Sequence, residues 1–219
     1  MQKIVILGAT GGCVDVLDTI LDINAALSEA AYEVIGFLDD RKDLENTRVL
    51  GVPVIGPFAA ATELTDCAFV TGIGSPYNYW RREEIIKALG IPFERFATIV
   101  HPTAAISSSA ELGFGTVIHQ HAVITTGALI GNHVLILPQV VISHGATVGD
   151  FTIVNSGACL AGEVKVGRCC YLGARSAVRQ ETVLGDACQV GIGAVVLKDV
   201  APKTVVVGNP ARILRRIEN

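Results

Sequence analysis

The sequence has few charged and few aromatic residues, and it has no long uninterrupted hydrophobic run. Charged residues make up 17% of the 219 residues and the net charge is −4, which argues against a protein that binds nucleic acids or anionic membranes through a basic surface. Half of the residues are hydrophobic, but Gly, Asp, His or Arg interrupts every stretch before the ~18 residues that a membrane-spanning helix needs. We therefore expect the apolar residues to be buried in a regular, soluble architecture.

A signal-peptide pattern and a cysteine motif are also lacking. The N-terminus from Met1 to Gly8 runs directly into a strand-like segment, without an apolar region followed by a cleavage site. None of the six cysteines forms a CxxC pair, and their spacing fits no zinc motif. We expect a cytoplasmic protein with reduced, buried thiols.

A repeat of six residues dominates the second half of the chain. Every sixth residue from Ile106 to Val196 is Ile, Leu or Val, which gives sixteen consecutive aliphatic positions. A parallel column two residues earlier, from Ala104 to Ala194, consists almost entirely of small residues. Short strands with one large and one small inward residue fill a triangular prism of 18 residues per coil. The pattern predicts a left-handed parallel β-helix of the hexapeptide-repeat type.

The first hundred residues follow a different pattern. Apolar runs at 3–8, 33–38, 52–55 and 67–73 predict strands, and apolar residues at helical spacing predict helices over 14–27 and 83–89. This alternation is typical of a small, doubly wound α/β domain. We therefore predict an α/β Rossmann-like N-terminal domain over 1–98, the β-helix over 99–203, and a C-terminal tail over 204–219 that covers one end of the prism.

The strands of the repeat also carry apolar residues at outward positions. Examples are Val117, Val123, Leu129, Leu135 and Val141. Flat sides that are apolar on both faces predict contacts with partner subunits, and closure around a three-fold axis predicts a homotrimer.

A glycine-rich loop, from Gly8 to Gly12, follows the first predicted strand. Such a loop at the start of a helix offers backbone N–H groups to a phosphate, but Thr10 and Cys13 stand where the dinucleotide fingerprint needs glycine. Nucleotide binding and a tight turn without a ligand remain open. Asp39 and Asp40 end the second strand beside this loop, where carboxylates either accept hydrogen bonds from a ribose or base, or cap local backbone.

Five histidines are candidates for chemistry. His144 shares its column of the prism with Gly162, 18 residues later, which places the two residues one coil apart at roughly 5 Å. A zinc hydratase of this fold would need three histidines around a metal, and the spacing of His119, His121 and His144 does not fit that arrangement. We expect His101 at the joint between the domains, and His119, His121 and His133 at a surface or a subunit interface.

Several motifs together resemble a known family, the sialic acid O-acetyltransferase-like family, which includes N-acetyltransferases of nucleotide-linked 4-amino-4,6-dideoxyhexoses. The resemblance covers essentially the whole chain and is carried by Gly8-Ala9-Thr10-Gly11-Gly12, Gly36-Phe37-Leu38-Asp39-Asp40, Ile73-Gly74-Ser75, Ile99-Val100-His101-Pro102-Thr103-Ala104, Ile142-Ser143-His144, Val148-Gly149-Asp150-Phe151 and Val207-Gly208-Asn209-Pro210-Ala211.

The resemblance implies an acetyl-CoA-dependent sugar N-acetyltransferase of bacterial glycan biosynthesis, with active sites between the subunits of a trimer and no metal. Sugar O-acetylation by the same machinery is the alternative, and a metal-dependent or non-enzymatic β-helix protein is a remoter one. His144 matches the catalytic histidine, and Gly162 matches the glycine whose backbone N–H meets the thioester carbonyl. The remaining expected contacts are, for CoA, Gly162, Gly173, Ala174, Arg175, Gly191, Gly193 and Arg212, and for the nucleotide sugar, Gly11, Gly12, Asp39, Asp40, Ser75 and Asn155.

Two positions depart from the family pattern. Gly12 stands where members often have a histidine, and Gly145 stands where many have an acidic residue directly after the catalytic histidine. If a carboxylate sets the basicity of the imidazole in this chain, another residue must supply it. Asn155 and Asp150 are the nearest polar candidates in the sequence.

Overall fold

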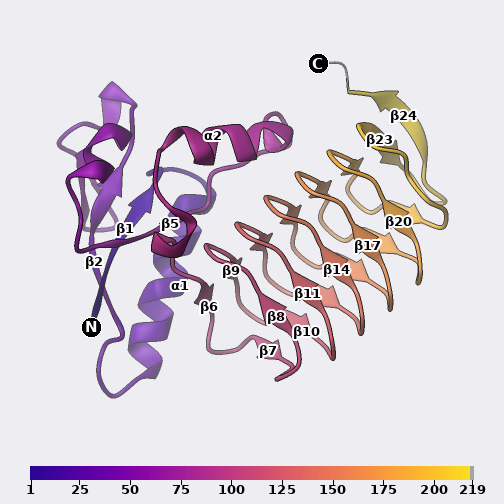
Figure 1. Ribbon diagram of the computed structural model, residues 1–219, viewed down its shortest axis with the longest axis horizontal. Coiled ribbons are helices and arrows are strands. Elements are labelled where there is room, and N and C mark those ends of the chain that lie inside the picture. The colour runs from indigo at the N-terminus through magenta and orange to yellow at the C-terminus, as the bar shows by residue number, and fades with distance from the viewer. Residues whose placement is uncertain (218–219) are drawn as a thin grey trace.

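The computed structural model describes residues 1–217 and divides them between an α/β domain and a long triangular prism, which lie side by side in Figure 1. The α/β domain contains, in chain order, β1 (Gln2–Leu7), α1 (Gly12–Ala26), β2 (Tyr32–Leu38), η1 (Lys42–Leu44), β3 (Arg48–Val49), β4 (Val52–Gly56), η2 (Phe58–Thr62), β5 (Ala68–Thr71), η3 (Tyr79–Arg81), α2 (Arg82–Ala88) and η4 (Phe93–Arg95).

The sheet of this domain has the strand order β3-β4-β2-β1-β5, and β1, β2, β4 and β5 are parallel. The inner strand β1 is buried from Ile4 onward, as its continuous apolar run predicts. One face of the sheet packs against α1 and the other packs against α2 and η2. The Rossmann-like prediction is therefore confirmed.

The prism is built from three parallel sheets, which we number as faces 1 to 3. Face 1 contains β6 (Ile99–Val100), β9 (Val117–Ile118), β12 (Leu135–Ile136), β15 (Ile153–Val154), β18 (Tyr171–Leu172), β21 (Gln189–Val190), β23 (Thr204–Val207) and the antiparallel β24 (Arg212–Arg216). Face 2 contains β7 (Ala105–Ile106), β10 (Val123–Ile124), β13 (Val141–Ile142), β16 (Cys159–Leu160), β19 (Ala177–Val178) and β22 (Val195–Val196). Face 3 contains β8 (Glu111–Leu112), β11 (Leu129–Ile130), β14 (Thr147–Val148), β17 (Lys165–Val166) and β20 (Val183–Leu184).

The predicted period of 18 residues is confirmed. Val123 pairs with Val141 and Ile124 with Ile142, and the same offset repeats along each face until β21 and β23, which pair at an offset of 16. The aliphatic column and the small column both point inward and form one continuous core. This arrangement is the left-handed parallel β-helix expected from the hexapeptide repeat.

Each coil turns at three corners, which stack into three edges of the prism. The histidine corner joins faces 2 and 3 and contains residues 125–127, 143–145, 161–163 and 179–181. The glycine corner joins faces 1 and 2 and contains 155–157, 173–175 and 191–193. The joint corner joins faces 3 and 1 and contains 113–115, 131–133, 149–151, 167–169 and 185–187.

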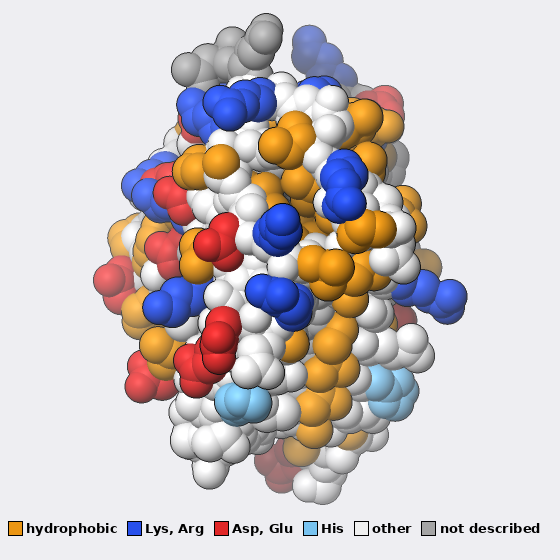
Figure 2. Space-filling view, turned by 90° about the vertical axis from the view of Figure 1, so that its right-hand side faces the viewer, with side chains coloured by type: hydrophobic (Ala, Val, Ile, Leu, Met, Phe, Trp, Pro, Cys, Tyr) orange, Lys and Arg blue, Asp and Glu red, His pale blue; other side chains and the backbone are white. Residues whose placement is uncertain are grey.

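Helix α1 lies between the sheet of the N-terminal domain and face 1 of the prism, and it packs against both. Its apolar residues share one core with the sheet and with outward side chains of face 1, among them Val117, Leu135 and Ile153. The expectation that partner subunits cover Val117 and Leu135 is therefore wrong, because the N-terminal domain of the same chain covers them. Leu129 on face 3 is 44% exposed. Figure 2 shows hydrophobic side chains in a band along the side of the prism that faces away from the N-terminal domain.

Arg82 holds the two domains together at the joint corner. Its side chain is fully buried, and its guanidinium donates hydrogen bonds to Ile73 O at 2.6 Å and to His133 O and Phe151 O at 2.8 Å each. Burial lowers the pKa of Arg82 to about 10, so the group stays charged at neutral pH. One buried cation thus bridges the loop after β5 and two coils of the prism.

The thiols follow the prediction with one exception. All six cysteines are free and five are buried, but Cys159 lies exposed on face 2 because its side chain points outward from β16. Within residues 1–217, no helix is both long and apolar enough to cross a membrane.

Candidate active site

His144 projects from the histidine corner into solvent and leans over the next coil. Its Nε2 and Cε1 atoms lie where a Cβ on Gly162 would stand, so no larger residue fits at position 162 without displacing the imidazole. The one-coil separation expected from the spacing of 18 is therefore observed. His144 is exposed and Gly162 is buried, which places the imidazole on an open surface with backbone beneath it.

The backbone N–H of Gly162 is free. The flanking N–H groups of Ala161 and Glu163 donate to Val178 O and His144 O, whereas that of Gly162 makes no hydrogen bond within residues 1–217. At the same corner, the backbone N–H groups of Thr126, His144 and Gln180 also make no hydrogen bond within residues 1–217. An imidazole beside an unpaired N–H donor is an arrangement that can take a proton and stabilise an oxyanion.

The other residues expected to bind CoA lie elsewhere in the chain. Gly173, Ala174, Arg175, Gly191 and Gly193 belong to the glycine corner, which is separated from His144 by the width of face 2. One chain therefore brings only Gly162 to the histidine. The two corners can line a single groove only where two prisms meet.

The glycine-rich loop of the N-terminal domain has the geometry of a tight turn before a helix. Gly8 has φ +93°, and a Cβ there would lie 2.6 Å from Cys13 Sγ, so glycine is required. Gly11 is the N-cap of α1 and provides no side-chain hydrogen bond, and Gly11 is exposed while Gly12 is half-buried. The first turn of α1 is thus open for a ligand.

The two aspartates beside this loop differ in how many carboxylate oxygens remain free to accept a hydrogen bond from a ligand. Asp39 uses both oxygens locally, accepting from the backbone N–H groups of Ala9 and Arg41 at 2.9 Å each. Asp40 is exposed and uses only Oδ1 within residues 1–217, accepting from Phe58 N at 2.9 Å. The local-capping alternative therefore describes Asp39, and Asp40 keeps an oxygen for a ligand.

The remaining predicted polar contacts are held by local hydrogen bonds. Ser75 donates its N–H and its hydroxyl to Asn78 Oδ1, at 2.8 and 2.9 Å. Asn155, on the glycine corner, donates to Leu172 O at 2.7 Å, and Asp150, on the joint corner, accepts from Asn132 N at 2.7 Å. Neither Asn155 nor Asp150 lies on the corner of His144, so neither orients its imidazole in this chain.

The other histidines belong mainly to the joint between the domains. His101 Nε2 lies 3.0 Å from Asp22 Oδ2 of α1, as its expected joint position requires. The prediction of a surface or subunit interface is wrong for His119 and His133, because both are buried within this chain. Burial lowers the pKa of each of these two side chains to about 4. His121 is exposed.

No group of three or more His, Cys, Asp or Glu side chains within residues 1–217 has the geometry to hold a metal ion.

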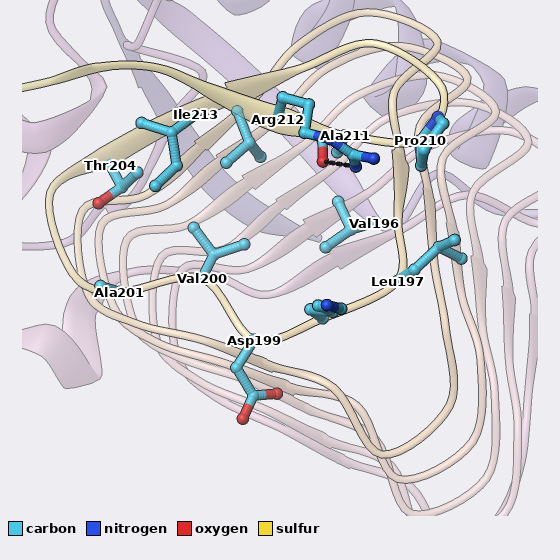
Figure 3. A pocket seen from close by; sticks show the side chains of 12 residues that line it. Val196, Leu197, Asp199, Val200, Ala201, Thr204, Pro210, Ala211, Arg212 and Ile213 are labelled. Atoms are coloured by element: carbon cyan, nitrogen blue, oxygen red, sulfur yellow. Dashed lines mark hydrogen bonds between the residues drawn. The ribbon is translucent and has the colours of Figure 1, made fainter.

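A cavity of about 460 Å³ lies at the C-terminal end of the prism, between the last coil and β24. Figure 3 shows Val196, Leu197 and Val200 on its floor and Pro210, Ala211 and Arg212 on the opposite side, where Arg212 Nη1 donates to Ala211 O at 2.9 Å. Lys198 also lines the cavity and continues the column of His144 three coils further on, which is roughly 14 Å along the prism. Arg212 was expected from the sequence to contact CoA, but the cavity that it lines was not predicted, because it forms only where the C-terminal tail folds back on the last coil.

A Rossmann-like domain joined to a left-handed β-helix, with a histidine over a glycine on an open corner, defines the class of hexapeptide-repeat acyltransferases. Residues 3–89 match the model of the PglD N-terminal domain. No curated protein sequence matches the chain.

Solved structures match along nearly the whole chain. The acetyltransferase domain of PglB from Neisseria gonorrhoeae FA1090 is 26% identical with a TM-score of 0.80, and the alignment covers 98% of this chain and 100% of that domain. The same domain in complex with acetyl coenzyme A is 28% identical at a TM-score of 0.80, covering 97% and 99% of the two chains. PerB from Caulobacter crescentus, in complex with CoA and GDP-perosamine, is 25% identical at a TM-score of 0.81, covering 97% of each chain. The resemblance inferred from the sequence is confirmed.

Proposed function

We propose that this protein transfers the acetyl group of acetyl-CoA to the 4-amino group of a nucleotide-linked 4-amino-4,6-dideoxyhexose. The observation that carries the proposal is the His144 imidazole over Gly162, on the fold of structures that bind acetyl coenzyme A and GDP-perosamine. The product class belongs to bacterial polysaccharide biosynthesis, and we assign the enzyme to the cytoplasm, where its nucleotide-sugar and CoA substrates are made.

The reaction needs little from the protein because a thioester is already activated. His144 accepts the proton that the sugar amine loses as its nitrogen attacks the thioester carbonyl. The Gly162 N–H donates to the oxyanion that develops on that carbonyl, a contribution typically worth about 3 kcal/mol. When the carbon–sulfur bond breaks, the imidazolium returns its proton to the departing sulfur, so that the products are the N-acetyl sugar and CoA.

The position of His144 supports a homotrimer with active sites between subunits. The N-terminal domain covers face 1, and the histidine corner is the corner of the prism opposite that face. An acceptor held by the N-terminal domain thus lies on the other side of the prism from the His144 of its own chain. In a ring of three copies, the N-terminal domain of one copy faces the histidine corner of the next.

The same assembly accounts for the residues assigned to CoA. In a groove between two prisms, Gly162 of one copy lies opposite the glycine corner of another, which contributes Gly173, Ala174, Gly191 and Gly193. We assign the nucleotide end of CoA to the C-terminal cavity, which Arg212 lines, and we assign Arg175, on the glycine corner, as a second cation for its phosphates. The cavity continues the column of His144, which supports a single path from nucleotide to thioester.

We assign the acceptor nucleotide to the first turn of α1. Gly11 and Gly12 present open backbone N–H groups for the diphosphate, and Asp40, with Asp39 behind it, faces the ribose or base. Ser75, on the loop after β5, and Asn155, on the adjacent glycine corner, are assigned to the sugar.

The test combines acetyl-CoA with UDP-, GDP- and dTDP-linked 4-amino-4,6-dideoxyhexoses, with free thiol release and product mass as readouts. We expect turnover with one nucleotide and loss of turnover in His144→Ala. His121→Ala, which alters another exposed histidine of the prism, is the matched control and should retain activity. Acetylation of sugar hydroxyls but of no amine would contradict the proposal and favour O-acetylation.

A further inference from the structure

The histidine corner carries a carboxylate that the sequence motifs do not identify. Gly145 and Glu163 hold the same position on adjacent coils, and both have left-handed backbone, with φ +63° and +59°. The Glu163 side chain leans back over Gly145, and its Cδ lies 2.6 Å from where a Cβ on Gly145 would stand. The carboxylate therefore fills the space that a side chain at position 145 would occupy.

The His144 and Glu163 side chains cross between the same two coils in opposite directions. His144 leans forward over Gly162, while Glu163 leans back over Gly145, and Glu163 N donates to His144 O at 2.9 Å. Each side chain thus lies above the glycine that adjoins the other residue. Both glycines are required, because a Cβ at either position would displace the imidazole or the carboxylate.

Few other charged groups surround the imidazole. The preceding coil contributes Thr125, Thr126 and Gly127 to this corner, and the following coil contributes Glu163 and, at the start of β17, Lys165. Glu181 lies one coil further from His144, where it accepts a hydrogen bond from Gln180 at 3.2 Å. Glu163 is the carboxylate of the coil packed against His144.

We propose that Glu163 is a positioning residue whose carboxylate, which makes no hydrogen bond or ion pair within residues 1–217, turns onto the His144 imidazole during acetyl transfer, orients the ring and stabilises its protonated form. The inference rests on the proposed function, since it assigns a role within that reaction. A base is most effective when a third group fixes its ring and offsets the positive charge that it gains. Glu163 supplies this group from the adjacent coil, at the place where a side chain of residue 145 would lie.

The first test is kinetic. Glu163→Gln should lower kcat about 10- to 100-fold with little change in KM, and should move the acidic limb of the pH–rate profile to lower pH, because the imidazolium loses its neighbouring charge. Glu181→Gln, at the same corner position one coil further, is the matched control and should behave as the parent protein. Parent-like kcat and pH profile in Glu163→Gln, or an equal loss in both variants, would overturn the inference.

A swap of the carboxylate between coils separates positioning from folding. In Gly145→Glu/Glu163→Gly the new side chain starts where the present carboxylate lies, and the left-handed backbone at 163 shows that glutamate tolerates this conformation. We expect the swap to recover most of the kcat lost in Glu163→Gln. A swap variant that folds but remains as slow as Glu163→Gln would contradict the assignment.

The last readout is independent of the acceptor. Diethyl pyrocarbonate modifies neutral imidazoles, so the rate of His144 modification against pH, followed by peptide mass spectrometry, reports how the ring is protonated. Glu163→Gln should shift this profile to lower pH by about half a unit, and Glu181→Gln should not. If no amino sugar is acetylated, the proposed function fails, while this profile still decides whether Glu163 acts on His144. An unshifted profile overturns the inference.

Discussion

His133 at the joint corner and His144 at the histidine corner occupy similar turns of one prism, but they have opposite surroundings. His133 is fully buried and stacks on Phe151 with ring centroids 5.3 Å apart, and burial, together with the nearby Arg82 charge, lowers its pKa to about 4. His144 is exposed and has only a glycine beneath its ring. His133 is the third, left-handed residue of its turn (φ +54°) and His144 is the middle residue of its turn. Position in the turn and the neighbours of each corner together decide whether a histidine supports the fold or is available for chemistry.

The sharpest test of this comparison removes the exposed histidine. His144→Ala should lower kcat by about 10²- to 10⁴-fold, because no other group at this corner takes its place as the base. The free energy of unfolding should change by less than about 0.5 kcal/mol, since the side chain is on the surface. Steady-state kinetics and urea unfolding of the same preparation check both. A loss of stability comparable in free energy to the loss of activity would show that His144 also supports the fold, and would contradict the comparison with His133.

At the joint corner we expect a substitution to lower the stability of the protein. Arg82→Met leaves two buried carbonyl oxygens and one partly buried carbonyl oxygen without their donor, and it should lower the free energy of unfolding by about 3 kcal/mol. Arg81→Met is the matched control, because within residues 1–217 Arg81 is exposed and pairs only with Glu84, and it should cost less than about 1 kcal/mol. Urea titration followed by the fluorescence of Trp80, the single tryptophan, reports directly on this joint. Equal effects of the two substitutions would refute the role of Arg82.

Adding a methyl group at Gly162 tests whether the position of the His144 ring matters for activity. Gly162→Ala puts a Cβ where the His144 imidazole lies, so the ring must move while the backbone keeps its conformation. We expect a loss of about 10²-fold in kcat, as for other small displacements of a reacting group, and a nearly unchanged KM. Gly127→Ala, on the same corner, meets no atom within 4 Å and isolates the effect of the ring, although its φ of +68° adds strain. An unimpaired Gly162→Ala enzyme would show that the contact is unimportant.

The last prediction concerns the pH dependence of stability at the joint. His119 and His133 stay neutral in the folded protein down to about pH 4, whereas in the unfolded chain they take up protons near pH 6.5. Lowering the pH from 7 to 5 therefore favours the unfolded state, by about 2 kcal/mol for each histidine. Urea unfolding at both pH values measures the loss. His119→Gln should remove about half of it, while His121→Gln, at an exposed position, should leave it unchanged.

Much of the architecture could be predicted from the sequence because the repeat is strictly local. The columns that begin at Ala104 and Ile106 give the coil length, the inward residues and the neighbours of each position, so the pairing of His144 with Gly162 followed from arithmetic alone. The strands β1, β2, β4 and β5 and the helices α1 and α2 follow equally from their apolar periods, whereas the short strand β3 and the 3-10 helices were not predicted.

The contacts between the domains could not be predicted in this way. Val117 and Leu135 are outward-facing by their period, and only the docking of α1 shows that the same chain buries them. His119 illustrates the same limit, since its Nδ1 lies 2.8 Å from the Thr19 hydroxyl, which itself donates to Asp15 O. The proximity of Glu163 to Gly145, by contrast, can be predicted from the offset of 18. The polar residues nearest to His144 in the chain, Asn155 and Asp150, were considered instead, and these lie on other corners.

The sharing of α1 between two cores also has a consequence for how the chain assembles. Each coil of the prism contacts chiefly the coils before and after it, so a solenoid of this kind has no intrinsic starting point. Helix α1 packs against the outward apolar side chains of the first coils of face 1. We expect the coils to form in sequence from this end, with the N-terminal domain as their template and the C-terminal strands as the last segment to close.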